Sequence, residues 1–182
     1  MSDVKHLTTA ELEAGLDVIR QSPSETGTLD LIVRRPATDL REMLERGELD
    51  LARGLIGDIW NAQPNPNLDS QINIMNARVV ALISPDPDRR PLAGDQLYLD
   101  FDLSVRNLPA GTRLAIGDAV VEVTPEPHTG CVKFTQRFGL DAMRFVNSPV
   151  GKELRLRGLN AKVVQPGTIQ AGDVVRKLPP SA

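Results

Sequence analysis

An alternation of apolar and polar residues in the second half of the chain constrains its fold more than any other feature. Leu97, Leu99, Phe101 and Leu103 occupy every second position, with more polar residues between them. Successive side chains of a strand point to opposite faces, so this spacing predicts a strand with one face in a core and the other in solvent. Residues 119–123 show the same alternation and predict a second such strand.

Several other segments have a strand-like composition. They are residues 29–33, 79–83, 113–116, 154–157, 161–164 and 174–178. The fourteen glycines and fourteen prolines favour turns over long helices. Many short strands with little helix predict a closed or nearly closed β-barrel, since closure removes exposed sheet edges. The expected fold class is therefore mainly β, a barrel with a few short peripheral α-helices.

Three short helices are expected around these strands. Thr8 and Glu11 form a capping box that begins the first helix, which should end before Pro23. A second helix is predicted over residues 39–47, and a third over residues 141–147, before Ser148-Pro149.

The dipeptide Gly-Asp occurs four times, and each copy leads into an apolar segment. The copies are at residues 57–58, 94–95, 117–118 and 172–173. Their unequal spacing is not that of a repeat, and glycine followed by aspartate is typical of a turn. Metal ligation by these aspartates is the alternative, which requires that they cluster in space.

Length and composition limit the class of protein. The 182 residues predict a single domain over residues 1–182, and one cysteine excludes a disulfide framework. The net charge of −3 and only six aromatic side chains argue against nucleic-acid binding. The longest apolar run has five residues, far short of a membrane span, and no export signal precedes it. A reducing cytoplasm is the expected location.

The charge is unevenly distributed along the chain. Residues 131–182 carry nine basic and three acidic side chains, whereas the first 130 residues are acidic on balance. The single cysteine, Cys131, is the first residue of this basic segment.

The segment around Cys131 contains groups that could activate a thiol. Pro125 and Pro127 restrict the backbone, and Gly130 permits a close approach to neighbouring groups. His128 lies three residues before the cysteine and could relay a proton or lower the pKa of the thiol. Equally, a single cysteine is often a packed apolar side chain, and a histidine in a proline-rich loop often has no chemical role.

Basic residues after the cysteine are candidates for binding an anion. Lys133 and Arg137 could stabilise a thiolate. Arg155 and Arg157 are two residues apart on a predicted strand, which would present both guanidinium groups to a phosphate or carboxylate. The alternative is a solvated strand face.

An ordered set of motifs resembles the MOSC domain, which is named for the C-terminus of molybdenum cofactor sulfurases. Residues 108–124 read LPAGTRLAIGDAVVEVT and are followed by His128-Thr129-Gly130-Cys131. Residues 157–164 and 167–175 look like the closing strands of that family, and residues 54–58 and 71–75 look like its earlier landmarks. The resemblance covers about residues 50–178, which leaves residues 1–49 as a helix-containing segment that covers the barrel.

The resemblance implies a MOSC-type β-barrel and a role for Cys131 as sulfur acceptor or molybdenum ligand. It also implies the molybdenum cofactor, molybdopterin, whose phosphate the basic segment could hold. The chain has no room for a desulfurase domain and no pyridoxal-phosphate lysine motif. Its sulfur would then come from a partner such as a pyridoxal-phosphate-dependent cysteine desulfurase and pass to a molybdoenzyme. Gly130 stands where many family members carry proline.

Three functions follow from these observations. The first is a domain that carries sulfur or binds molybdenum cofactor at Cys131. The second is a molybdenum-dependent oxidoreductase that acts on small N-oxygenated compounds, as the resemblance allows. The third is a non-catalytic interaction barrel with a packed cysteine.

Overall fold

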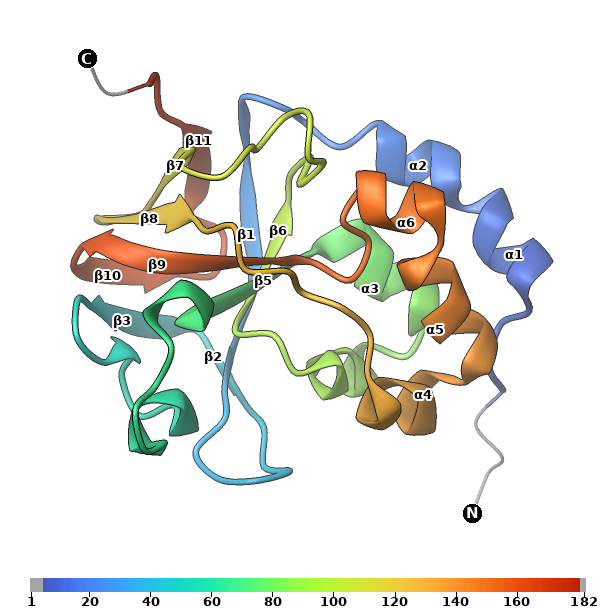
Figure 1. The fold of residues 1–182 in the computed structure, drawn as a ribbon, viewed down its shortest axis with the longest axis horizontal. Coiled ribbons are helices and arrows are strands. Elements are labelled where there is room, and N and C mark those ends of the chain that lie inside the picture. The colour runs from blue at the N-terminus through green and yellow to red at the C-terminus, as the bar shows by residue number, and fades with distance from the viewer. Residues whose placement is uncertain (1–4, 181–182) are drawn as a thin grey trace.

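A closed seven-stranded barrel forms the centre of the molecule in the computed structural model, which describes residues 5–180 (Figure 1). Around the barrel, each strand pairs with the next and the last returns to the first. The order is β1 (Thr26–Arg34), β11 (Val174–Lys177), β7 (Arg113–Ile116), β8 (Ala119–Val123), β9 (Leu159–Gln165), β5 (Ile72–Asn76) and β6 (Leu97–Asp100).

Strand β1 closes the barrel because it is long enough to pair with two neighbours. Its residues 26–28 pair with β11, and residues 28–32 pair with β6, across an irregularity between Leu29 and Leu31. The short strand β2 (Glu42–Leu44) pairs with the other end of β1. A separate three-stranded sheet consists of β10 (Gly167–Gln170), β3 (Arg46–Asp50) and β4 (Gly54–Leu55).

Helices cover one side of the barrel, to the right in Figure 1. They are α1 (Thr9–Ala14), α2 (Leu16–Arg20), α3 (Ala77–Ile83), α4 (Val132–Phe138), α5 (Leu140–Asn147) and α6 (Pro149–Glu153). Short 3₁₀ turns are η1 (Ile59–Ala62), η2 (Leu68–Ser70) and η3 (Pro87–Ala93). The predicted barrel with short peripheral helices is confirmed, although helical residues, 3₁₀ turns included, are about as numerous as strand residues.

Two hydrophobic cores result from this arrangement, one inside the barrel and one between its wall and the helices. Leu97 and Leu99 belong to the interior core, whereas Tyr98, between them on β6, belongs to the core beneath the helices. The expectation of a solvent-facing side for residues 97–103 is therefore wrong at Tyr98, which is fully buried. The strand is also shorter than predicted and ends at Asp100.

The predicted strand over residues 79–83 is instead helix α3. Strands β5 and β6 run parallel, and a parallel pair needs a crossover connection that an antiparallel hairpin does not. Helix α3 and η3 make that connection. A short apolar run fits a buried helix as well as a buried strand, so its composition could not separate the two.

Two further predictions of secondary structure are wrong, and one helix is divided. Residues 154–157 form turns after α6, and the helix predicted over residues 39–47 is a turn followed by β2, where Met43 is exposed.

The predicted N-terminal helix breaks at Gly15 into α1 and α2. A Cβ at Gly15 would lie 2.5 Å from the Leu82 side chain, so the break accompanies close packing on α3.

The segment before residue 50 does more than cover the barrel. Helices α1 and α2 do lie over it, but β1 is a barrel strand whose Leu29 and Ile32 are fully buried in the interior core. Within this segment the strand predicted over residues 29–33 is confirmed.

The four Gly-Asp pairs lie at turns, as predicted. Gly57, Gly94, Gly117 and Gly172 all have positive φ, between 53° and 94°, which glycine adopts without the strain of a side chain. Within residues 5–180 no three His, Cys, Asp or Glu side chains come together as a metal site would require. None of the described helices is long and apolar enough to cross a membrane.

Candidate functional site

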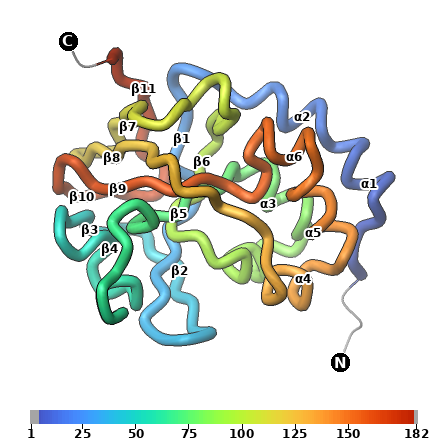
Figure 2. The backbone as a smooth tube through the Cα atoms, viewed as in Figure 1, coloured from blue at the N-terminus to red at the C-terminus, as the bar shows by residue number. Residues whose placement is uncertain are grey.

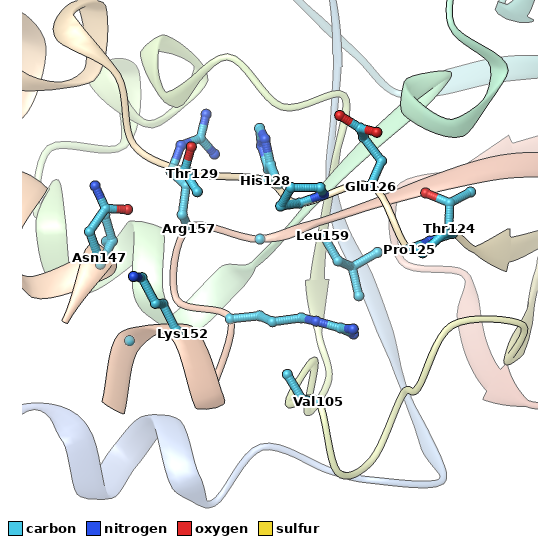
Figure 3. A pocket seen from close by; sticks show the side chains of 15 residues that line it. Val105, Thr124, Pro125, Glu126, His128, Thr129, Asn147, Lys152, Arg157 and Leu159 are labelled. Atoms are coloured by element: carbon cyan, nitrogen blue, oxygen red, sulfur yellow. The ribbon is translucent and has the colours of Figure 1, made fainter. Parts of the chain in front are cut away.

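A cavity of about 400 Å³ lies between the loop that leaves β8, the helices α5 and α6, and the start of β9 (Figure 3). Residues 124–129 of that loop form one wall. The other walls include Asn147 of α5, Lys152 of α6, and residues 155 and 157–159, which lead into β9. Figure 2 shows the loop as it runs from β8 across the start of β9 to α4.

Two asparagines bind the cysteine loop, residues 124–131. Asn160 of β9 donates from Nδ2 to the carbonyl oxygens of Glu126, at 3.1 Å, and Pro127, at 3.3 Å. Near the other end, the Gly130 amide donates to Oδ1 of Asn147 at 3.0 Å. A Cβ at Gly130 would lie 2.8 Å from the sulfur of Met143, so the close approach expected of this glycine is observed.

His128 points to a buried carboxylate. Its Nε2 lies 2.7 Å from Oδ1 of Asp95, which follows η3 and is fully buried. The second carboxylate oxygen accepts from Nη1 of Arg157 at 2.7 Å. Burial acts to raise the pKa of Asp95, but the charges and hydrogen bonds of Arg157 and His128 outweigh it, so the pKa lies below its usual value.

Arg157 is itself almost completely buried, with 7% of its surface exposed. Its Nη2 donates to the Ala93 carbonyl at 3.0 Å, and the guanidinium lies 5.1 Å from the centre of the Phe134 ring. Its Nε is buried and has no hydrogen-bond partner among the described residues. Arg157 therefore keeps one N–H group unsatisfied in a residue that lines the cavity.

Arg155 and Lys152 add positive charge to the same cavity. Arg155 has a left-handed backbone, with φ of 49°, and donates from Nη1 to the Leu108 carbonyl at 2.6 Å. Burial lowers the pKa of its guanidinium. Lys152 is exposed, and no carboxylate of residues 5–180 forms an ion pair with it. Arg155 and Arg157 thus share a cavity although the strand predicted to carry them is absent.

Cys131 is exposed at the residue before α4 and is not part of the cavity wall. The cavity-lining residue Thr129 precedes it by two positions, which limits their Cα separation to about 7 Å. No hydrogen bond joins the thiol to His128 in the described chain, because the imidazole points to Asp95. The proposed Cys131–His128 pair is therefore not formed as a direct contact.

Lys133 and Arg137 lie on α4 and contact the turn between β1 and β2. Both bind Oδ1 of Asp39, at 3.2 Å and 2.9 Å. Hydrogen bonding and charge from Lys133, assisted by the charge of Arg137, lower the pKa of that carboxyl. The two residues are not part of the cavity wall, so the basic segment divides into two separate groups.

Sequence reasoning missed three residues that build this site. They are Asp95, which binds His128 and Arg157, and the two asparagines that fix the loop, Asn147 and Asn160. The sequence places Asp95 in a turn, with metal ligation as the alternative. It is 33 residues from His128 and 62 from Arg157, so local spacing carried no signal of either contact.

Comparison with known proteins gives a family match for part of the chain and shows the fold. Residues 89–176 match the MOSC domain family, as the sequence motifs predicted, and this relates the chain to the C-terminal domain of molybdenum cofactor sulfurases. Strands β1 and β5, which complete the barrel, lie before the matched residues. No curated protein sequence gives a significant match.

Solved structures with the same fold include the YuaD protein from Bacillus subtilis, with a TM-score of 0.62 and 16% identity over 82% of this chain and 94% of that one. YiiM from Escherichia coli has a TM-score of 0.56 and 17% identity, over 85% of this chain and 71% of that one. YiiM from Geobacillus stearothermophilus has a TM-score of 0.53 and 14% identity, over 86% and 74%. At these identities the similarity shows the fold alone.

Proposed function

Because residues 89–176 match the MOSC domain, we propose that this chain binds molybdenum cofactor or carries its sulfur at Cys131. The observation that carries the proposal is the position of the thiol. Cys131 is exposed, two residues beyond the wall of a cavity lined by three basic side chains, Lys152, Arg155 and Arg157.

The residues present fit a phosphate-bearing cofactor. Glu126 is the one carboxylate among the side chains of the cavity wall, against those three basic groups. Arg157 has a buried N–H group without a partner, and Lys152 has no ion pair in the described part of the chain. Guanidinium and ammonium groups are the usual partners of phosphate, and soft thiolate sulfur is a suitable ligand for a transition metal.

Each group then has a distinct part in the proposal. Lys152 and the guanidinium groups of Arg155 and Arg157 would hold the phosphate, and Cys131 would supply a thiolate to molybdenum. When bound, the cofactor supplies a redox-active metal centre. The chain itself fixes the loop through Asn147 and Asn160, and this holds the thiol at a constant position relative to the basic cavity.

The sulfur-carrier form of the proposal uses the exposure of Cys131. Its thiolate attacks the outer sulfur of a donor cysteine persulfide, a new S–S bond forms on Cys131, and the donor leaves as a thiolate. A protein donor can reach an exposed thiol. The donor we propose is a pyridoxal-phosphate-dependent cysteine desulfurase, with a molybdoenzyme as the eventual recipient.

Two measurements test the proposal. After incubation with a cysteine desulfurase and cysteine, intact mass should show a one-sulfur adduct on the wild type and none on Cys131→Ala. Protein purified from a host that makes the cofactor should contain molybdenum, and Cys131→Ala should contain less. Absence of both the adduct and the metal would exclude the proposal.

An oxidoreductase on small N-oxygenated compounds is the second candidate, which we propose because the cavity has the volume of a small-molecule site. Metal-loaded protein supplied with an artificial electron donor, such as reduced methyl viologen, should then reduce such a compound, and protein without molybdenum should not. The third alternative, a non-catalytic interaction barrel, expects a packed cysteine, whereas Cys131 is exposed.

A further inference from the structure

The imidazole of His128 has neighbours at Nε2 and Cδ2, whereas Nδ1 has no partner among the described residues. Nε2 binds Asp95 at 2.7 Å. The Cδ2 side faces Gly158, where an added Cβ would lie 3.1 Å from that carbon, and Gly158 has φ of 113°. Nδ1, at the remaining side of the ring, has no hydrogen-bond partner among the described residues. His128 lines the cavity (Figure 3), so Nδ1 is the ring nitrogen that Asp95 leaves for a bound ligand.

Asp95 determines which nitrogen of the neutral ring carries the proton. An ionised carboxylate only accepts hydrogen bonds, so the ring must donate from Nε2. The neutral ring then has a lone pair at Nδ1, directed away from Asp95. This is the arrangement in which a carboxylate orients a histidine for acid–base chemistry.

Neutralising Asp95 does not require His128. Arg157 is buried beside the carboxylate and binds it at 2.7 Å, so this pair already compensates the charge. The His128 side chain is 17% exposed, whereas that of Asp95 is completely buried. His128 itself lines the cavity, whose wall also carries Lys152 and Arg155.

We propose that Asp95 and His128 form an acid–base dyad that serves a small anionic ligand of this cavity. His128 takes a proton from a ligand O–H through Nδ1, and the electrons of that bond remain on the ligand oxygen. The imidazolium, stabilised by Asp95, returns the proton in the reverse step. Asp95 is a positioning residue. The proposal rests on the proposed function only in taking this cavity as the ligand site.

Several charged groups surround His128 and can influence its protonation in the test. Asp95 and Arg157 lie on the Nε2 side, Glu126 is on the same loop, and Lys152 and Arg155 line the cavity. The probe is sulfate, because it resembles a phosphate group yet has no proton to lose near neutral pH. Its effects therefore report on the histidine.

Nitrogen NMR of ¹⁵N-histidine-labelled protein resolves the two histidines of the chain, and His6→Gln assigns them. At alkaline pH, wild-type His128 should carry its proton on Nε2. Saturating sulfate should raise its titration midpoint by about one pH unit, a tenfold change in proton affinity. A proton on Nδ1, or a midpoint that sulfate does not move, overturns the proposal.

Asp95→Asn tests whether Asp95 sets the tautomer of His128. Arg157 can only donate, so the new carboxamide must present its oxygen to Arg157 and its NH₂ group to His128. His128 must then accept at Nε2, and its proton should move to Nδ1. An unchanged tautomer in the folded variant overturns the assignment of Asp95.

If Asp95→Asn does not fold, His128→Gln takes its place. Sulfate affinity of the wild type should decrease about tenfold as His128 loses its proton, whereas affinity of the variant should stay constant. Equal pH dependence in both proteins overturns the dyad. All measurements use a metal-free Cys131→Ser background, so a failure here is distinct from failure to bind molybdenum or sulfur.

Discussion

The two groups of the basic segment lie in different surroundings although both consist of Lys and Arg residues. Arg155 and Arg157 lie at the cavity, where Arg157 is buried against Asp95. Lys133 and Arg137 lie on α4 and share Asp39, whose side chain is 61% exposed. Charge count alone would have treated the four residues as equal. The difference teaches that basic residues close together in sequence form one site only where the fold brings them to the same cavity.

The largest expected effect is the loss of Arg157. Arg157→Met leaves the buried carboxylate of Asp95 without its guanidinium partner, which should lower the free energy of unfolding by about 3–5 kcal/mol. Arg137→Met is the matched control from the other group. It loses a 2.8 Å hydrogen bond to the Leu92 carbonyl, worth about 1 kcal/mol.

Chemical denaturation of both variants and the wild type measures these losses. Equal losses for Arg157→Met and Arg137→Met would show that burial does not separate the two groups.

The second effect is the dependence of stability on acid. The pKa of Asp95 is lower in the folded protein, so its ionised form stabilises the fold. That contribution is complete above the unfolded pKa of about 3.9 and is lost as pH falls through the lower folded value. Wild-type stability should therefore decrease below about pH 3.9, and Asp95→Asn should decrease less steeply.

Denaturation at a series of pH values from neutral to acid measures the two slopes. Asp39→Asn is the control, because Asp39 is exposed and its pair is screened by solvent. Its slope should match that of the wild type. If Asp39→Asn reduced the pH dependence of stability more than Asp95→Asn does, the comparison would be reversed.

The barrel could be predicted from sequence because most of its strands follow a local rule. Residues 113–116, 119–123, 161–164 and 174–178 alternate or are strand-like, and β7, β8, β9 and β11 occupy or include most of these positions. The segment over residues 79–83 gave the wrong element because the parallel pairing of β5 and β6, which requires a crossover, is not visible locally.

The site could be predicted only in its local parts. The motif around Cys131 and the basic residues can be read directly from the sequence. So can the close approach that Gly130 permits, which the structure shows against Met143. The contacts of Asp95 with His128 and Arg157 join three distant segments. Which charges are buried together depends on the closed barrel, so no spacing rule could have paired them.

The smallest expected effect concerns the field at Cys131. Lys133 is two residues from the thiol, and its side chain is 56% exposed. It should attract an anionic reagent but not a neutral one. In Lys133→Met, the ratio of the alkylation rates by iodoacetate and by iodoacetamide should be about twofold lower than in the wild type at low salt, and this difference should disappear at high salt. The ratio cancels any change in the fraction of thiolate, since both reagents consume the same species.

Arg176→Met, an exposed position on β11, is the matched loss of charge on the barrel and should leave the ratio unchanged. A ratio that falls equally in both variants would show that net charge, and not the neighbouring lysine, controls access of anions to the thiol.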